Sequence, residues 1–152
     1  MIEQRLKELG IVLPDAAPPS FNYVAVTLHR GIAYVSGQLP KVGDEVRVFG
    51  KVGAEVDLET ARGEARICAI QALACLKQAL GTLDRVDRIL KVNGYVASAA
   101  GFNAQPKVID AASDLLVAVF GENGRHARAA VGVAELPRDA AVEIEMTIAY
   151  RE

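Results

Sequence analysis

The chain has few aromatic residues, no tryptophan and only two cysteines. Phenylalanine and tyrosine make up 5% of its 152 residues. Cys68 and Cys75 stand about two turns apart on one face of a helical pattern, which is too far for a disulfide without distortion. No CxxC or Cys/His ligand spacing is present either. We interpret both cysteines as small residues of the core.

The sequence also lacks an excess of basic charge and a long apolar run. It has 17 Lys and Arg against 19 Asp and Glu, whereas nucleic-acid binders usually carry a basic face. The alanine-rich stretch after Arg66 is interrupted by Gln71 and Lys77, so it is not a membrane span. Residues 1–10 have no apolar core of a signal peptide. We therefore expect a cytoplasmic protein with no nucleic-acid or membrane partner.

Nucleotide-binding motifs are missing, because the glycines at 43, 50 and 53 do not form GxGxxG after a strand and no GK[ST] follows. A length of 152 residues favours one domain, and 51% hydrophobic with 24% charged residues is typical of a globular protein. We expect residues 1–20 to form a short helix and a proline-rich connector packed on the body. Residues 21–152 are expected to form a single domain.

Hydrophobic periodicity predicts two long helices and a sheet. The segment Asp57–Leu80 begins with a good N-cap residue and is followed by glycine. The segment Pro106–Phe120 begins with a proline, which suits the first helical position. Helices combined with an antiparallel sheet give the α+β class. Extended segments are predicted at Tyr23–His29, Ile32–Gln38, Glu45–Phe49 and Val86–Ala97.

The C-terminal run GRHARAAVGVAELPRDAAVEIE, residues 124–145, predicts an antiparallel β-hairpin. Its first strand is Ala129–Glu135, its turn is Leu136–Asp139, and its second strand, Ala141–Tyr150, alternates apolar and polar residues. Arg128 stands at the start of the hairpin. Its planar fork of N–H donors matches the two oxygens of a carboxylate, so it is a candidate ligand-binding residue.

This run resembles the signature of the RidA (YjgF-like) family, whose members are small trimeric reactive-intermediate deaminases with a chorismate-mutase-like fold. The segment YVSGQ, residues 34–38, is similar to the family's strand that ends in SGQ, and Tyr23 stands where the family has a tyrosine. The resemblance covers roughly residues 22–150 in matching order. It implies a chorismate-mutase-like α+β fold, with a mostly antiparallel sheet and two helices packed on one face.

The resemblance also implies a reaction and a site. Enzymes of the family hydrolyse enamines and imines, such as 2-aminoacrylate, to a keto acid and ammonia. By resemblance, Arg128 holds the substrate carboxylate, and Glu143 and Tyr23 orient water or move a proton. No metal or organic cofactor is required. The implied partners are a small carboxylated substrate and further copies of the chain, in a homotrimer with sites at subunit interfaces. The other expected substrate-binding residues are Ser36, Gly37, Ser113 and His126.

Three positions depart from the family pattern. Ala130 stands where a cysteine is frequent, which excludes a thiol-dependent role. Ser113 is the best match to an asparagine that the family favours in the second helix. His126 stands where proline is commoner. These departures indicate a divergent branch with its own substrate pocket.

Several of these candidates also have a structural interpretation. Tyr23 is either a site residue or a core or interface tyrosine with a satisfied hydroxyl. Ser36 is either a site residue or part of a turn at the end of a strand. Arg128 is either a substrate anchor or the partner of Glu143 or Glu145 in an ion pair. His126 is either a general base or a structural or surface residue of a turn.

Three functional hypotheses follow, and the first is favoured. The first is an imine/enamine deaminase anchored by Arg128. The second is a non-catalytic binding or regulatory module for a carboxylated metabolite. The third is the endoribonuclease or translation-inhibitor activity that some family names carry. The acidic charge balance and the lack of a His–His or His–Lys catalytic pair argue against the third.

Overall fold

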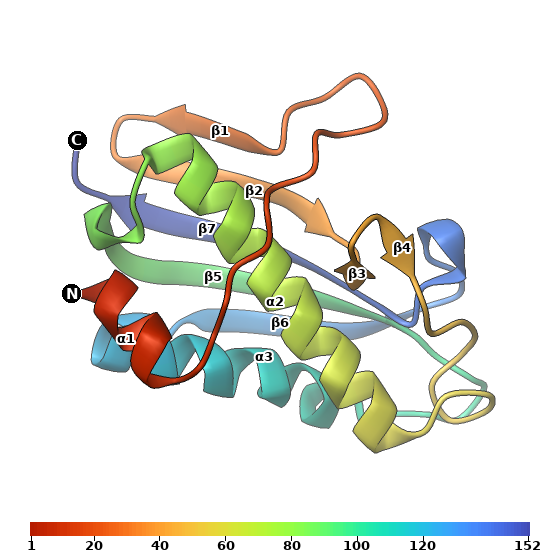
Figure 1. The fold of residues 1–152 in the computed structure, drawn as a ribbon. Coiled ribbons are helices and arrows are strands. Elements are labelled where there is room, and N and C mark those ends of the chain that lie inside the picture. The colour runs from red at the N-terminus through yellow and green to blue at the C-terminus, as the bar shows by residue number, and fades with distance from the viewer.

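A computed structural model describes all 152 residues and shows a five-stranded sheet with helices on one of its faces (Figure 1). The strand order is β1-β2-β7-β5-β6, and every neighbouring pair is antiparallel except β5 with β6. The predicted α+β fold is therefore confirmed. The strands of the sheet are β1 (Val26–His29), β2 (Ile32–Gln38), β5 (Val86–Ala97), β6 (Ala127–Val133) and β7 (Val142–Tyr150).

Two long helices, α2 (Leu58–Leu80) and α3 (Gln105–Phe120), lie side by side over the sheet (Figure 1). Asp57 caps α2 by accepting a hydrogen bond from the Thr60 N–H group. None of the helices has the length and apolar character needed to cross a membrane. The shorter elements are α1 (Ile2–Glu8), β3 (Lys41–Val42), β4 (Glu45–Val46), η1 (Leu83–Arg85), η2 (Gly121–Gly124) and η3 (Pro137–Asp139).

The predicted apolar stripe of α2 faces the core. Its alanines at 61, 65, 69 and 72 are fully buried, and both cysteines are buried without a disulfide. Small side chains let the helix approach the sheet closely. One charged residue of α2, Glu64, is buried as well. Burial raises the pKa of Glu64, and its Oε2 atom has no hydrogen-bond partner.

The predicted C-terminal hairpin is wrong in its pairing. The strands β6 and β7 do not pair with each other, because β5 lies between them: β6 runs parallel to β5, and β7 runs antiparallel to it. The turn itself is where it was expected, with Arg138 and Asp139 at positive φ. Residues 134–141 connect β6 to β7. This segment is long enough to span two strand spacings and so to pass β5. Alternation alone cannot distinguish this crossing from a hairpin.

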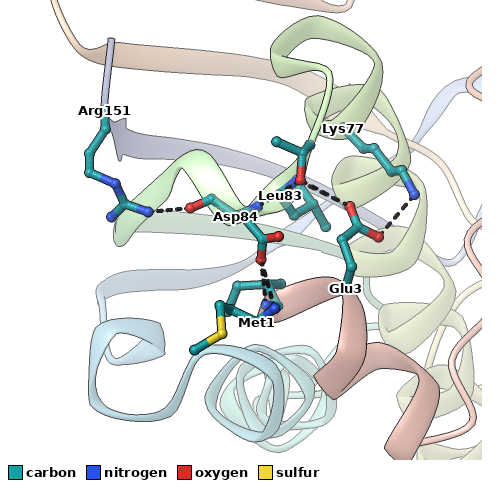
Figure 2. A network of polar contacts seen from close by, with 8 residues as sticks. Met1, Glu3, Lys77, Leu83, Asp84 and Arg151 are labelled. Carbon is teal, nitrogen blue, oxygen red and sulfur yellow. Dashed lines mark hydrogen bonds and ion pairs between the residues drawn. The ribbon is translucent and has the colours of Figure 1, made fainter.

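Polar contacts hold the N-terminal helix α1 to the body (Figure 2). The Glu3 carboxylate forms a 3.0 Å ion pair with Lys77 and accepts a 3.3 Å hydrogen bond from the Leu83 N–H group. Asp84 accepts a 2.5 Å hydrogen bond from the Ile2 N–H group. Burial opposes ionisation of Glu3, but these partners outweigh it and lower the pKa of Glu3. After α1, residues 11–21 run as an extended strap across α2 toward β1 (Figure 1).

The sheet and α3 come closest where Gly94 of β5 lies under Ile109. A Cβ atom at Gly94 would overlap with the Ile109 side chain, which is fully buried. We therefore expect Gly94→Ala to lower the free energy of unfolding by about 1–3 kcal/mol, the usual cost of overpacking a core. Denaturant unfolding monitored by circular dichroism measures this change.

Gly63 provides the matched control, because it is an exposed residue of α2 with open space where a Cβ would stand. Replacing a glycine inside a helix by alanine stabilises by about 0.5–1 kcal/mol. Gly63→Ala should therefore stabilise the protein while Gly94→Ala destabilises it. Equal effects of the two substitutions would contradict this account of the packing between α3 and β5.

Candidate functional site

The expected site residues gather in two separate places. The first, called here the Glu143 cavity, has a volume of about 290 Å³ and lies between the strap, the end of β2 and the start of β7. Apolar atoms of the strap form part of its wall. The residues of this cavity that carry the argument below are Tyr23, Gly37, Lys41, Arg138 and Glu143.

A bulge in β2 shapes the cavity. Val35 pairs with Met146 and Gln38 with Ile144, so Ser36 and Gly37 have no regular partners on β7. A Cβ atom at position 37 would stand 2.7 Å from the Glu143 Oε2 atom. Only glycine therefore lets the carboxylate lie against β2 at this point.

Ser36 has a structural role in this chain. Its Oγ–H group donates a 2.7 Å hydrogen bond to the Val24 carbonyl, and its N–H group donates one of 2.8 Å to Ala25. These two bonds fix the segment between the strap and β1 against β2. The Ser36 side chain is not among those that line the Glu143 cavity.

Glu143 is a half-buried residue of β7. The opposite face of this strand carries buried apolar side chains. Burial raises its pKa, and the nearby charge of Glu145 raises it further. Glu145 is itself held by Tyr95, whose hydroxyl donates a 2.5 Å hydrogen bond, and by Asn93 at 3.1 Å. That hydrogen bond, burial and the two carboxylates raise the pKa of Tyr95 to about 12. Glu143 therefore keeps its proton up to a higher pH than an exposed glutamate does.

Arg128 lies in the second place, where β6 faces α3. Its Nη1 atom donates to Asp110 Oδ1 at 2.7 Å and to Ser113 Oγ at 3.1 Å, and its Nη2 atom donates to the Pro106 carbonyl at 3.3 Å. Its side chain is 21% exposed. The structural alternative expected an ion pair of Arg128 with Glu143 or Glu145. The structure shows an ion pair with Asp110 instead.

Ser113 and His126 meet beside Arg128. The Ser113 Oγ atom is 2.8 Å from His126 Nε2, and His126 Nδ1 is 2.6 Å from the Gly124 carbonyl oxygen. Burial lowers the pKa of His126, and the positive charge of Arg128 also lowers it, against the opposing effect of the Gly124 carbonyl. His126 is therefore a neutral, oriented ring near pH 7. It is neither a loose turn residue nor an exposed one.

These side chains border a shallow depression, called here the Arg128 pocket. It has a volume of about 230 Å³ and shares no residue with the Glu143 cavity. The pocket is lined by Ser113, Asp114, Val117, Arg125, His126 and Arg128.

The strand register separates Arg128 from Glu143. Arg128 pairs with Val92 of β5, and Glu143 pairs with Tyr95 of the same strand. Because the two β5 residues stand three positions apart, their partners point to opposite faces of the sheet. One chain therefore brings Ser113, His126 and Arg128 together, and separately Tyr23, Gly37 and Glu143, but it does not join the two groups.

Three residues that lie at the Glu143 cavity or beside Arg128 were not predicted from the sequence as site residues. Asp110 stands one helical turn before Ser113 on α3, so helical spacing could have indicated it as a partner of Arg128. Lys41 of β3 and Arg138 of η3 both line the Glu143 cavity. No short-range pattern relates them, so only the folded chain reveals that two cations lie near Glu143.

Comparison with known proteins decides the family. A family model described as "YjgF/chorismate_mutase-like, putative endoribonuclease" matches residues 3–146. The chain belongs to the YjgF/RidA family. Its segments that resemble this family, around Tyr23, Ser36 and Arg128, all lie within the matched range.

Relatives within the YjgF/RidA family differ in what their names say. The protein TCP17 of Trypanosoma cruzi is 45% identical over 97% of this chain and 92% of its own length. The crystal structure of Atu1372 from Agrobacterium tumefaciens, a protein of unknown function, is 48% identical, covers 99% of this chain and 92% of its own, and superposes with a TM-score of 0.91. A Dermatophagoides farinae protein named 2-iminobutanoate/2-iminopropanoate deaminase is 33% identical over 73% of this chain and 82% of its own length.

The raised pKa of Glu143 gives a prediction for its environment. Glu145→Gln removes the neighbouring negative charge but leaves Glu143 buried. We therefore expect the pKa of Glu143 to fall and yet to stay above that of an exposed glutamate, because burial is the larger cause. A carboxyl-carbon NMR titration measures it, with Glu135→Gln, at an exposed position, as the control. An unchanged pKa in Glu145→Gln would contradict this account.

Proposed function

We propose that this protein hydrolyses small carboxylated imines and enamines to keto acids and ammonia. The observation that carries the proposal is the state of Arg128. Asp110, Ser113 and Pro106 hold its guanidinium in place, yet they use only three of its five N–H donors. The Nε–H group and one hydrogen of Nη2 have no partner in the chain, and two donors suffice for a carboxylate.

Glu143 supplies the second requirement, an acid near the imine nitrogen. Its raised pKa keeps more of it protonated near neutral pH than is usual for a carboxyl group. Tyr23 lines the same cavity and is half exposed, so its hydroxyl can contact a ligand or an attacking water. The name of the mite relative, an imine deaminase, supports this reaction class for the family.

The two groups of residues form one site only if different subunits supply them. Proteins of this family are typically trimers that bind small molecules. In such an assembly, the resemblance implies that Arg128 of one subunit would face Tyr23 or neighbouring residues of the next, and we propose that Glu143 is one of them. The separation of the two groups by β5 within one chain supports this arrangement, because a site inside a single subunit cannot use both.

A second function, carboxylate binding without catalysis, is favoured by one observation. Lys41 and Arg138 lie at the Glu143 cavity within a single chain, so they supply positive charge there without Arg128. Such a module would bind keto acids and amino acids without hydrolysing imines. Accelerated release of keto acid distinguishes the deaminase from this alternative.

Arg128→Ala tests the anchor. Hydrogen bonds to charged groups contribute about 1.5–3 kcal/mol each, so loss of the anchor should lower kcat/KM by about 10²-fold or more. An amino-acid oxidase generates the imine in situ, and keto-acid release is followed with wild type and variant. A variant as active as wild type would contradict the role of Arg128.

Arg62→Ala is the matched control. Arg62 of α2 also attaches to α3 through a backbone carbonyl, that of Lys107, and an aspartate, Asp114. It borders neither the Arg128 pocket nor the Glu143 cavity. Both variants lose a contact with α3, so a loss of activity in Arg128→Ala alone separates the site from general loosening of the helix.

Mixing two inactive variants tests the shared site. Arg128→Ala and Glu143→Gln should each be nearly inactive, but each keeps the half of the site that the other has lost. In trimers reassembled from equal amounts, about a quarter of the interfaces combine two intact halves, so about a quarter of wild-type activity should return. Assay of the mixture, with sedimentation to verify the trimer, measures this. No recovery in mixed trimers would contradict a site shared between subunits.

A further inference from the structure

The geometry points to Ser113 and His126 as a proton relay beside Arg128, in which His126 exchanges a proton with the bound substrate through the Ser113 hydroxyl. This inference rests on the proposed function and deepens it. Ser113 would be the catalytic hydroxyl that touches the substrate. His126 would act through it.

The hydrogen-bond distances determine the direction of the relay. The Gly124 carbonyl oxygen can only accept, so the 2.6 Å contact requires a proton on His126 Nδ1. The Nε2 atom of the neutral ring is then an acceptor, and the 2.8 Å contact is donated by the Ser113 Oγ–H group. Arg128 Nη1 donates to the same Oγ atom at 3.1 Å. The hydroxyl proton therefore points to a base while the oxygen faces a cation.

This arrangement has the features of an activated hydroxyl. A hydroxyl becomes a proton carrier when a base lies within hydrogen-bond reach and a third group orients that base. His126 is the base and the Gly124 carbonyl is the orienting group. Ser113 also lines the Arg128 pocket together with Arg128 and His126.

The charges around His126 favour its neutral form. Burial and the positive charge of Arg128 lower the pKa of His126. Arg125 is paired with Glu122 at 3.1 Å, so these two charges largely offset each other. The charged groups on the elements around His126 are Lys107, Asp110 and Asp114 of α3, Glu122 of η2, Asp87, Arg88 and Lys91 of β5, Arg125 before β6, and Arg128 of β6.

The relay completes the proton balance of imine hydrolysis. In the addition step, the water oxygen bonds to the imine carbon and gives a proton to Ser113 Oγ, while the Ser113 proton moves to His126 Nε2. The imine nitrogen takes a proton from Glu143 of the neighbouring subunit, which yields a neutral carbinolamine.

In the second step the carbon–nitrogen bond breaks. The nitrogen takes the His126 proton through Ser113 and leaves as ammonia with the bonding electron pair. The carbinolamine hydroxyl returns its proton to Glu143 as the carbonyl forms. One imine and one water thus become one keto acid and one ammonia, and both ionisable groups regain their starting forms.

The test compares the pH dependence of kcat in wild type, His126→Gln and Ser113→Ala. Wild-type activity should fall as the pH drops through the pKa of His126, because the protonated ring cannot accept a proton. His126→Gln offers Ser113 an acceptor that cannot take up a proton. It should lose about 10²-fold in kcat, the usual contribution of one acid–base group, together with this acidic limb. Ser113→Ala should show a similar loss of kcat and should lose the acidic limb as well.

The outcomes separate the relay from the proposed function. His29→Gln, which changes the other histidine, should leave the profile unchanged. An active wild type with an equally active His126→Gln variant and an unchanged acidic limb would overturn the relay alone. A wild type that hydrolyses no imine would overturn the proposed function and the relay with it. NMR of the wild-type imidazole nitrogens is independent of how the variants fold: an Nε2–H tautomer of His126 would overturn the relay, and an Nδ1–H tautomer supports it.

Discussion

The attachment of Arg128 to α3 is the constraint on which the site depends. The strand β6 is at the edge of the sheet, and its arginine reaches across to Asp110, Ser113 and the Pro106 carbonyl. Such an arginine loses little further conformational freedom when a ligand binds, because the protein has already fixed its guanidinium. The Asp110 carboxylate also offsets its charge, which reduces the cost of keeping a cation only 21% exposed. A structural ion pair and a ligand anchor are therefore compatible functions of one side chain.

Burial acts in opposite directions on the acid and the base of the two half-sites. It raises the pKa of Glu143 and lowers the pKa of His126, because in both cases it disfavours the charged form. Both shifts move the two pKa values toward each other, so a larger fraction of molecules has a protonated carboxyl group and a neutral imidazole at the same time. Hydrolysis of an imine needs such a pair, since one proton must leave the water while another reaches the nitrogen.

Sequence patterns predicted the elements of the fold better than their connections. The Asp57 cap, the apolar stripe of α2 and the alternation of β7 are local features, so they could be read from spacing alone. The position of β5 between β6 and β7 is a long-range property, and the local pattern favoured a hairpin instead. The same limit applied to the site. Arg128 could be identified from its motif, and helical spacing places Asp110 on the same face of α3 as Ser113, but the contact between Arg128 and Asp110 depends on how α3 lies over β6.

Two of the positions at which we expect a departure from the family pattern, Ser113 and His126, are in contact in the folded chain. Ser113 of α3 and His126, just before β6, meet at 2.8 Å beside Arg128. Ala130, where the resemblance leads us to expect a cysteine, lies on β6. The thiol cannot be supplied by alanine, whereas a hydroxyl hydrogen-bonded to a neutral imidazole supplies another group that exchanges protons. Because Ser113 contacts both His126 and Arg128, substitutions at these positions are expected to have coupled effects rather than independent ones.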